Sequence, residues 1–366
     1  KSTNITKHSD YGPRMTNSLH GIPSLSVATE TDGLVINYTP ELRASVELIY
    51  PDGSDGFQED CGIARFGNYY TPTFYKRNLR LYFRAMHGNA QLNYPFFKGF
   101  ERGIDPVESF DQIDLRSGSH DMVDRGFYMS QPFFDDTMLE IGNLNPHGRY
   151  LHVYINGEYW GVYHVHERWK ASTFTAYFGG ADDDYEAVDT EGSVDDWTYD
   201  GTSNPTHPVD GDGTVWTNYV QGLGTNYYAV RNYLDVPRYV DFMLTWLFGH
   251  SEAEFRGVGA KAGGPACYKL WLKDADGWLS WSPVHALSNP GPADVYTNLW
   301  KEGNADYKVL KLDRTYKLFF HDGALTSDRN VERLTRRCDE IEAPFYSEVA
   351  RWPNVRPGVP NHTPSS

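Results

Sequence analysis

The stretch YINGEYWGVYHVHERW, residues 154–169, carries the clearest structural signal in the chain. Apolar side chains alternate on both sides of the pair Asn156-Gly157. An Asn-Gly pair between alternating apolar runs is typical of a tight β-hairpin. The second predicted strand ends in His164, His166, Glu167 and Arg168. We therefore predict a stiff aromatic hairpin with Glu167 at its end, either as a solvated strand end or as half of an ion pair that organises a site.

Length and composition indicate a folded chain with a sizeable core. The 366 residues fit one large domain or two lobes. Hydrophobic residues make up 40% and aromatic residues 15% of the chain. No apolar run reaches the roughly 18 residues that cross a bilayer. We expect no signal peptide within these residues, although a mature secreted chain would have lost one. We expect no membrane span.

Charge and cysteine content narrow the classes of partner. The formal net charge is −16, and nucleic-acid binders usually carry a basic face, so we expect no nucleic-acid partner. Metal ions or cationic groups suit such a chain, as does simple solubility in a salty extracellular medium. Cys61, Cys267 and Cys338 are far apart, which disfavours a zinc knot. They fit either one disulfide with a free thiol or three buried free thiols.

The pattern along the chain indicates an α+β organisation. Residues 1–168 are strand-rich and begin with a polar, extended arm over residues 1–20, and residues 169–352 are helix-rich. Residues 181–214 are acidic and read as loop, and residues 353–366 form a Pro-rich tail that we expect to be flexible. Helices are predicted within residues 124–142, where a glycine ends the pattern, and within 170–178, 307–323 and 326–352, the last opened by a Thr or Ser cap, with two more helices within 228–249.

Two acidic segments could bind cations. In KDADG, residues 273–277, Asp274 and Asp276 follow an apolar strand. Hard cations prefer carboxylate oxygens, and the glycine lets the backbone turn around an ion. The same residues also fit a plain Asp-Gly turn. Asp210 and Asp212 resemble the start of a calcium loop without its downstream Glu. We interpret them as loop, with a structural Ca²⁺ as an alternative.

A basic group stands out in this acidic chain. The segment YKRNLR contains Lys76, Arg77 and Arg80, hereafter the basic strand. Such groups suit a phosphate clamp, and a solvated strand face is the plain alternative. No GxSxG, HExxH or P-loop motif occurs. The run His250-Ser251-Glu252 offers hydrolase residue types, but neighbours in sequence rarely face one another, so it is weak support for a catalytic triad.

The order of several sequence segments along the chain matches that of a known protein family. SVELIYPDGSDGFQ, KRNLRLYFRAMHG, IDLRSGSHD, the hairpin, LKDADGWL and FFHDGALT resemble, roughly over residues 22–352, the CotH family of spore-coat protein H kinase-like proteins. The resemblance implies a secreted or cell-surface bacterial protein with a two-lobed, atypical protein-kinase-like fold. It also implies ATP and Mg²⁺ or Mn²⁺ between a strand-rich lobe, residues 1–168, and a helix-rich lobe, residues 169–352, with phosphate transfer to Ser or Thr.

Several positions match the family pattern. The basic strand matches the family's KKSFR and would hold nucleotide phosphates. Glu167 matches the Glu of YNLRE and would pair with the basic strand, as kinase sites require. Asp274 and Asp276 match WDxD and would hold the metal, with Asp274 also a catalytic candidate.

One segment departs from the family pattern. Where the family has DWxxNN, this chain has GHSEAEFRG. Glu252 takes the place of the Asp and could act as base or metal ligand. Arg256 takes the place of a metal-binding Asn, and its charge repels Mg²⁺. It could instead contact phosphate. This departure puts turnover in doubt, though not nucleotide or metal binding.

Three functions therefore stay open. The first is an active phosphotransferase that acts on an extracellular or surface protein. The second is a catalytically inactive kinase-like module that binds in a surface or polysaccharide-associated assembly, where the aromatic residues would suit glycan stacking. The third is a hydrolase of an extracellular polymer that uses a carboxylate pair outside the known motifs. The kinase interpretation rests on family analogy at the site.

Overall fold

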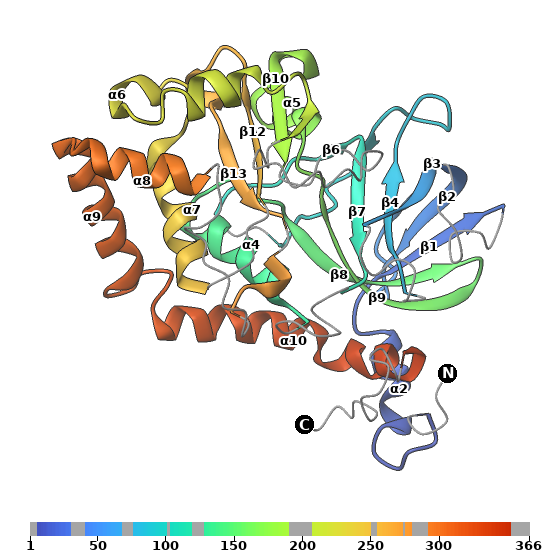
Figure 1. The fold of residues 1–366 in the computed structure, drawn as a ribbon. Coiled ribbons are helices and arrows are strands. Elements are labelled where there is room, and N and C mark those ends of the chain that lie inside the picture. Colours follow the sequence, from blue (N-terminus) through green and yellow to red (C-terminus); the bar gives the residue numbers. More distant parts are fainter. Residues whose placement is uncertain are drawn as a thin grey trace.

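The computed structural model describes residues 6–30, 41–67, 76–100, 103–118, 128–189, 207–249, 255–273, 275–279 and 292–352. Strands gather on one side of the molecule, and a second sheet with most of the helices lies on the other (Figure 1). This arrangement confirms the predicted α+β class.

The strand-rich side is a closed barrel, which the sequence did not predict. Its order is β1-β2-β3-β4-β7-β9-β8, closed by a parallel pairing of β1 with β8. The strands are β1 (Ser24–Thr29), β2 (Leu42–Ile49), β3 (Phe57–Phe66), β4 (Asn78–Tyr82), β7 (Gln112–Arg116), β8 (Gly148–Ile155) and β9 (Glu158–Glu167). A separate two-stranded sheet joins β5 (Leu92–Asn93) and β6 (Ser109–Phe110). Each barrel strand sends alternate apolar side chains inward, among them Leu25, Val46, Ile63, Leu81, Leu115, Val153 and Val165.

The aromatic hairpin forms as predicted. β8 and β9 pair antiparallel from Gly148 opposite His166 to Ile155 opposite Glu158. The turn residues Asn156 and Gly157 have φ values of 49° and 79°. Positive φ at both central residues is what a type I′ hairpin turn requires, and Asn and Gly tolerate it best.

The second sheet has the order β11-β10-β12-β13. Its strands are β10 (Tyr185–Asp189), β11 (His207–Asp210), β12 (Phe255–Ala260) and β13 (Lys269–Leu272). The prediction of loop over residues 181–214 was therefore wrong at both ends, and residues 190–206 lie outside the described part. β10 is buried along its whole length, because its apolar residues pack against α5 and β12.

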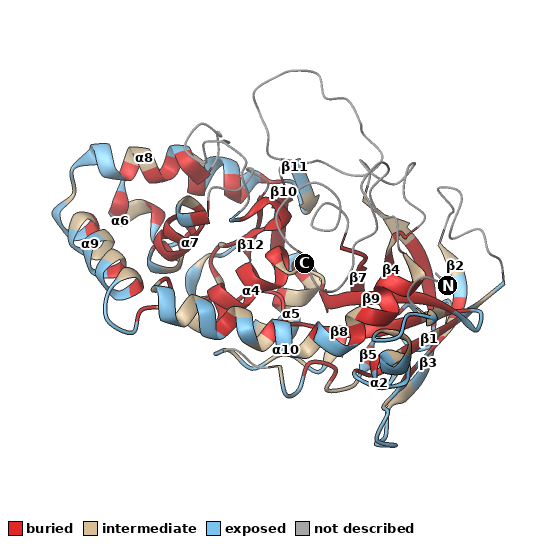
Figure 2. Cartoon of the chain, turned by 90° about the horizontal axis from the view of Figure 1, so that it is seen from below, coloured by how far each residue is buried: buried red, intermediate tan, exposed pale blue. Residues whose placement is uncertain are grey.

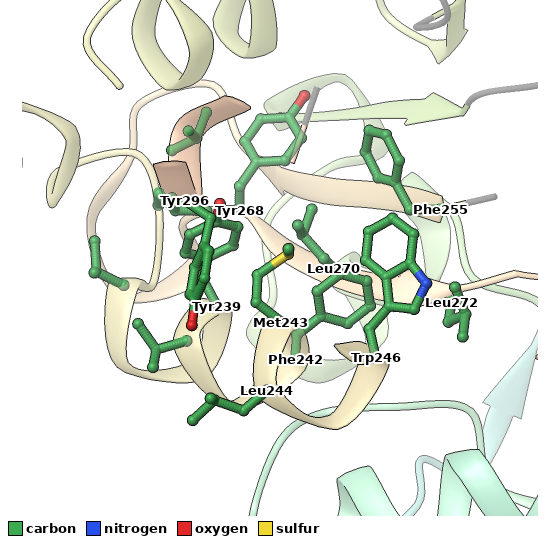
Figure 3. Close-up of a cluster of buried hydrophobic side chains, with 14 of the residues drawn as sticks. Tyr239, Phe242, Met243, Leu244, Trp246, Phe255, Tyr268, Leu270, Leu272 and Tyr296 are labelled. Atoms are coloured by element: carbon green, nitrogen blue, oxygen red, sulfur yellow. The ribbon is translucent and has the colours of Figure 1, made fainter. Parts of the chain in front are cut away.

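Helices cover this sheet, and the predicted ones all form. They are α4 (Ser130–Ile141), α5 (Ala171–Phe178), α6 (Tyr227–Val230), α7 (Val236–Gly249), α8 (Pro292–Glu302), α9 (Ala305–Phe319) and α10 (Ser327–Arg351), with a short π-helical segment at Trp216–Gln221. α4 ends at Gly142, whose φ of 88° only glycine adopts freely. α7 packs its aromatic residues against β12 and β13 in the main core (Figure 3).

Some local predictions need correction. The polar N-terminal arm is not extended over its described part, because α2 (Met15–Leu19) packs on α10 and Ser18 donates to the carbonyl of Pro344 over 3.1 Å. Thr326 stands at the N-cap of α10, but its hydroxyl donates to the Gly323 carbonyl and does not cap the helix. All three cysteines are free thiols, and Cys338 is exposed. Within the described residues, no helix has the length and apolarity to cross a membrane.

Candidate functional site

The outer face of the barrel is polar where it meets the second sheet. Along this face Arg80 of β4 lies opposite Asp114 of β7, which lies opposite His166 of β9. All three are buried, because the second sheet covers them: the ring centroids of His166 and Trp271 are 6.1 Å apart. The strand alternation that sends leucine and valine inward therefore places charged residues in the contact between barrel and sheet.

Five charged residues meet at this contact, and we call them the arginine cluster: Arg80, Asp114, Arg168, Asp189 and Arg256. Arg80 Nη2 donates to Asp114 Oδ2 over 3.1 Å, and Arg168 Nη1 lies 3.5 Å from the same oxygen. Arg256 Nε donates to Asp189 Oδ2 over 3.0 Å. Asp189 and Arg256 are cross-strand partners at one end of the second sheet, so barrel and sheet each contribute to the cluster.

Arg168 is poorly compensated within this cluster. Burial, and then the positive charges of Arg80 and Arg256, lower the pKa of its guanidinium to about 9. Its Nε is buried without a hydrogen-bond partner. Burial raises the pKa of Asp114, but Arg80 and Arg168 outweigh it and hold that pKa well below its usual range. An arginine held between two others offers a favourable position to an anion.

A comparison with known protein families gives the family of the chain. The family model described as CotH kinase protein matches residues 63–249, which include Arg80, Asp114, Arg168 and Asp189. The match covers just over half of the 366 residues. The chain belongs to the CotH kinase protein family. A search of curated proteins found no match. Arg256 lies beyond the matched span.

Two candidate phosphate ligands that are far apart in the sequence come together in this member of the family. Arg80 belongs to the basic strand and Arg256 to the segment that departs from the family pattern. Both lie close enough to Arg168 to lower its pKa. Arg256 also donates from Nη1 to the Trp169 carbonyl over 3.0 Å. Arg256 is paired with Asp189, and any phosphate that it contacted would also lie near Arg168, whose charge is poorly compensated.

Lys76 has a different acidic partner from the one expected. Its Nζ lies 2.6 Å from Glu348 Oε1 and donates to the Val162 carbonyl over 2.6 Å. Glu348 belongs to α10 and also accepts from the Val162 amide over 2.6 Å. Burial lowers the pKa of Lys76, against the pull of Glu348. This pair fastens the C-terminal helix to the hairpin.

Glu167 does not form the predicted ion pair with the basic strand. Its Oε2 accepts from the His147 amide over 2.7 Å and from His147 Nδ1 over 2.9 Å. Its Oε1 accepts from the Tyr177 hydroxyl over 2.8 Å. The reason is strand alternation: Glu167 lies opposite Ile113, whose side chain faces the barrel interior, whereas Arg80 is on the outer face. Burial by itself lowers the pKa of His147, but the nearby Glu167 carboxylate outweighs burial, and the pKa of His147 is raised.

The predicted metal segment lies beside the same barrel face. Asp276 is 2% exposed and lies in the short 3₁₀ turn Ala275–Gly277. Its Oδ2 is 2.9 Å from Arg116 Nη2 of β7. Gln131 of α4 holds this turn, since its Oε1 accepts from the Ala275 amide over 2.7 Å and its Nε2 donates to the Leu272 carbonyl over 3.2 Å.

The metal expectations themselves stay predictions. Asp274 and Glu252 lie outside the described residues. Within the described ranges, no three His, Cys, Asp or Glu side chains form a group that could hold a metal ion. Of the suggested calcium residues, Asp210 accepts from the Ala171 amide over 2.9 Å and Asp212 from the Thr214 amide over 3.0 Å. Backbone amides thus already use both carboxylates.

The sequence interpretation missed most of the arginine cluster. The sequence presents Arg168 only as a charge at the end of the hairpin and gives no clear sign of a role for Asp114 or Asp189, nor for Glu348 outside the cluster. Two weak signals existed: Asp114 interrupts the apolar pattern of IDLR, and Asp189 ends the apolar run YEAVD. Each signal is ordinary by itself. It indicates a site only when the contact between the barrel face and the second sheet is known.

Proposed function

We propose that this CotH kinase protein binds a nucleoside triphosphate between the barrel and the second sheet and transfers its terminal phosphate to a protein hydroxyl. The observation that carries the proposal is the arginine cluster. In a chain with a net charge of −16, the buried Arg80 and Arg256 and the half-buried Arg168 converge where two structural units meet. Arg168 among them keeps an unpartnered buried Nε. Guanidinium groups match phosphate oxygens in geometry and charge.

Each residue has a definite part in the proposal. Arg80, Arg168 and Arg256 would bind phosphate oxygens and compensate the charge that develops during transfer. The Asp276 carboxylate would hold the Mg²⁺ or Mn²⁺ that accompanies ATP, a role that fits its oxygen donors. A two-lobed kinase-like arrangement, a secreted or cell-surface location, and Glu252 or Asp274 as catalytic group belong to the same proposal. The acceptor would be Ser or Thr of an extracellular or surface protein.

A second candidate function is binding without transfer. Two observations favour it. Arg256 occupies the position where the family pattern has a metal-binding Asn, and a guanidinium repels a divalent cation. Arg116 lies 2.9 Å from Asp276 and already balances its charge. In this version the cluster retains an anionic ligand, such as a nucleotide or an anionic surface polymer, and no phosphate moves.

Phosphate transfer from γ-labelled ATP tests the first candidate. Wild type is incubated with Mg²⁺ or Mn²⁺ and either itself or a casein-like acceptor. Asp276→Asn should lower the transfer rate by at least about 100-fold. Asp55→Asn, which removes an exposed carboxylate elsewhere, serves as the control and should keep the wild-type rate. ATP binding without labelled product would favour the second candidate, and absence of both would refute nucleotide-dependent function.

A further inference from the structure

Helix α9 presents a row of large apolar side chains to solvent. Val309, Leu312, Tyr316 and Phe320 are 67%, 63%, 54% and 55% exposed. Their spacing of three, four and four residues places them on one face of the helix and its C-cap. We call this row the α9 stripe. α9 lies at the outer edge of the molecule, far from the barrel, and shows exposed residues along its length (Figures 1 and 2).

The helix that carries the stripe is firmly held from its other side. Tyr307, Arg314 and Leu318 are buried, and Arg314 Nε donates to Asp241 Oδ1 of α7 over 2.6 Å. The rings of Tyr316 and Phe320 stack with centroids 5.3 Å apart. The exposure of the stripe is therefore not the result of a frayed end. Single exposed apolar residues are ordinary, but a contiguous row of them marks an interaction surface.

We propose that the α9 stripe binds the α9 stripe of a second copy of this chain, with the two helices antiparallel. A three- and four-residue apolar spacing is the seam of paired helices. A two-fold interface needs a self-complementary surface. Asp313 and Lys317 lie along one border of the stripe, and both are exposed. An antiparallel pair centred at Thr315, midway between Asp313 and Lys317, brings Asp313 beside Lys317 of the partner subunit, and the reverse.

The charge pattern selects this occupant over others. A partner of uniformly negative or positive charge would match only one of Asp313 and Lys317, whereas an antiparallel second copy matches both. The inference is independent of the proposed phosphotransferase function, because the stripe lies on α9 and none of the cluster residues does.

Molar mass in solution tests the proposal. Light scattering coupled to size-exclusion chromatography is run at protein concentrations on the order of 1–100 μM, the range in which modest interfaces associate. Wild type should approach twice the chain mass of 41.7 kDa as concentration rises. Leu312→Asp should stay at the monomer mass. Met86→Asp is the matched control, since Met86 is 77% exposed on a turn after β4, and it should dimerise like wild type.

Charge exchange tests the antiparallel geometry. Asp313→Lys or Lys317→Asp alone should weaken the dimer by roughly tenfold, and the double variant should restore it, because like charges then no longer face each other. Circular dichroism confirms that each variant is folded. A wild type that remains monomeric, even if the stripe binds another protein, would overturn the proposal. So would a dimer that survives Leu312→Asp, or a double variant as weak as the single ones.

Discussion

Replacing Arg168 by methionine should stabilise the ligand-free protein and weaken anion binding at the same time. Methionine keeps most of the side-chain length and removes the charge. Asp114 would keep its pair with Arg80, so the substitution leaves no carboxylate unpaired. The repulsion that Arg168 receives from Arg80 and Arg256 would disappear. A residue that costs stability without ligand and gains affinity with ligand is typical of a binding site.

The size of the effect follows from the pKa of Arg168. The fall from 12.5 to about 9 corresponds, at 1.36 kcal/mol per pH unit, to about 5 kcal/mol against the charged form. Both values lie above neutral pH, so Arg168 is charged in the folded and unfolded states at pH 7 and the whole penalty acts on folding. The side chain is 17% exposed, and water screens part of the repulsion. We therefore expect a net gain of about 1–3 kcal/mol in unfolding free energy.

Urea denaturation with and without inorganic phosphate measures both effects. Phosphate at a hundredfold excess over its Kd should stabilise wild type by about 2.7 kcal/mol and Arg168→Met much less. Arg314→Met is the matched control, because it breaks a buried bidentate pair with Asp241 and should cost about 3–5 kcal/mol. A destabilised Arg168→Met protein that still responds to phosphate like wild type would refute the reasoning and make Arg168 a structural residue.

Three further substitutions test other contacts. Glu348→Leu leaves Lys76 buried without its carboxylate and should lower the unfolding free energy by about 3–5 kcal/mol in urea denaturation; a loss below about 1 kcal/mol would contradict the pair's role. Glu167 raises the pKa of His147, so the stabilisation from this pair is complete below about pH 6.5 and is lost as pH rises through the folded-state pKa. His147→Gln should then cost more unfolding free energy at about pH 6 than at about pH 9, and a cost independent of pH would contradict this. Gln131→Leu removes both hydrogen bonds to the Asp276 turn and should speed amide exchange in residues 272–278, with a loss of about 2–3 kcal/mol; unchanged exchange there would show that the turn holds itself.

Sequence reasoning succeeded where a short segment determines its own shape. The hairpin formed as predicted, since Asn156-Gly157 accepts the positive φ values of the turn. α4 stopped at Gly142 for the same reason. Local reasoning failed where tertiary contacts decide the outcome. β10 lies in an acidic segment that looked like loop, and it is a strand because α5 and β12 cover it.

The same difference between local signals and tertiary contacts explains which residues of the candidate site could be predicted. Arg80 and Arg256 could be proposed from residue type and family pattern, but nothing in the sequence indicates that both lie near Arg168. The pairing of Lys76 with Glu348 joins residues 272 positions apart and could not be read from local pattern. The expected Glu167 pair failed because the register of β9 turns that side chain toward the barrel interior. Residue type and family pattern can suggest single candidate residues. Which charges become neighbours depends on which strands meet in the fold.

Isothermal titration with ATP and Mg²⁺ tests the central claim most directly, since the claim is that the arginine cluster holds nucleotide phosphates. We predict that wild type binds ATP and that Arg168→Met and Arg256→Ala each weaken binding by about 1.5–3 kcal/mol, roughly 10- to 150-fold, the scale of a lost charge-assisted hydrogen bond. Arg43→Met, which removes an exposed arginine of β2, should bind like wild type. Equal ATP affinity in all four proteins, or no binding by wild type, would contradict the account.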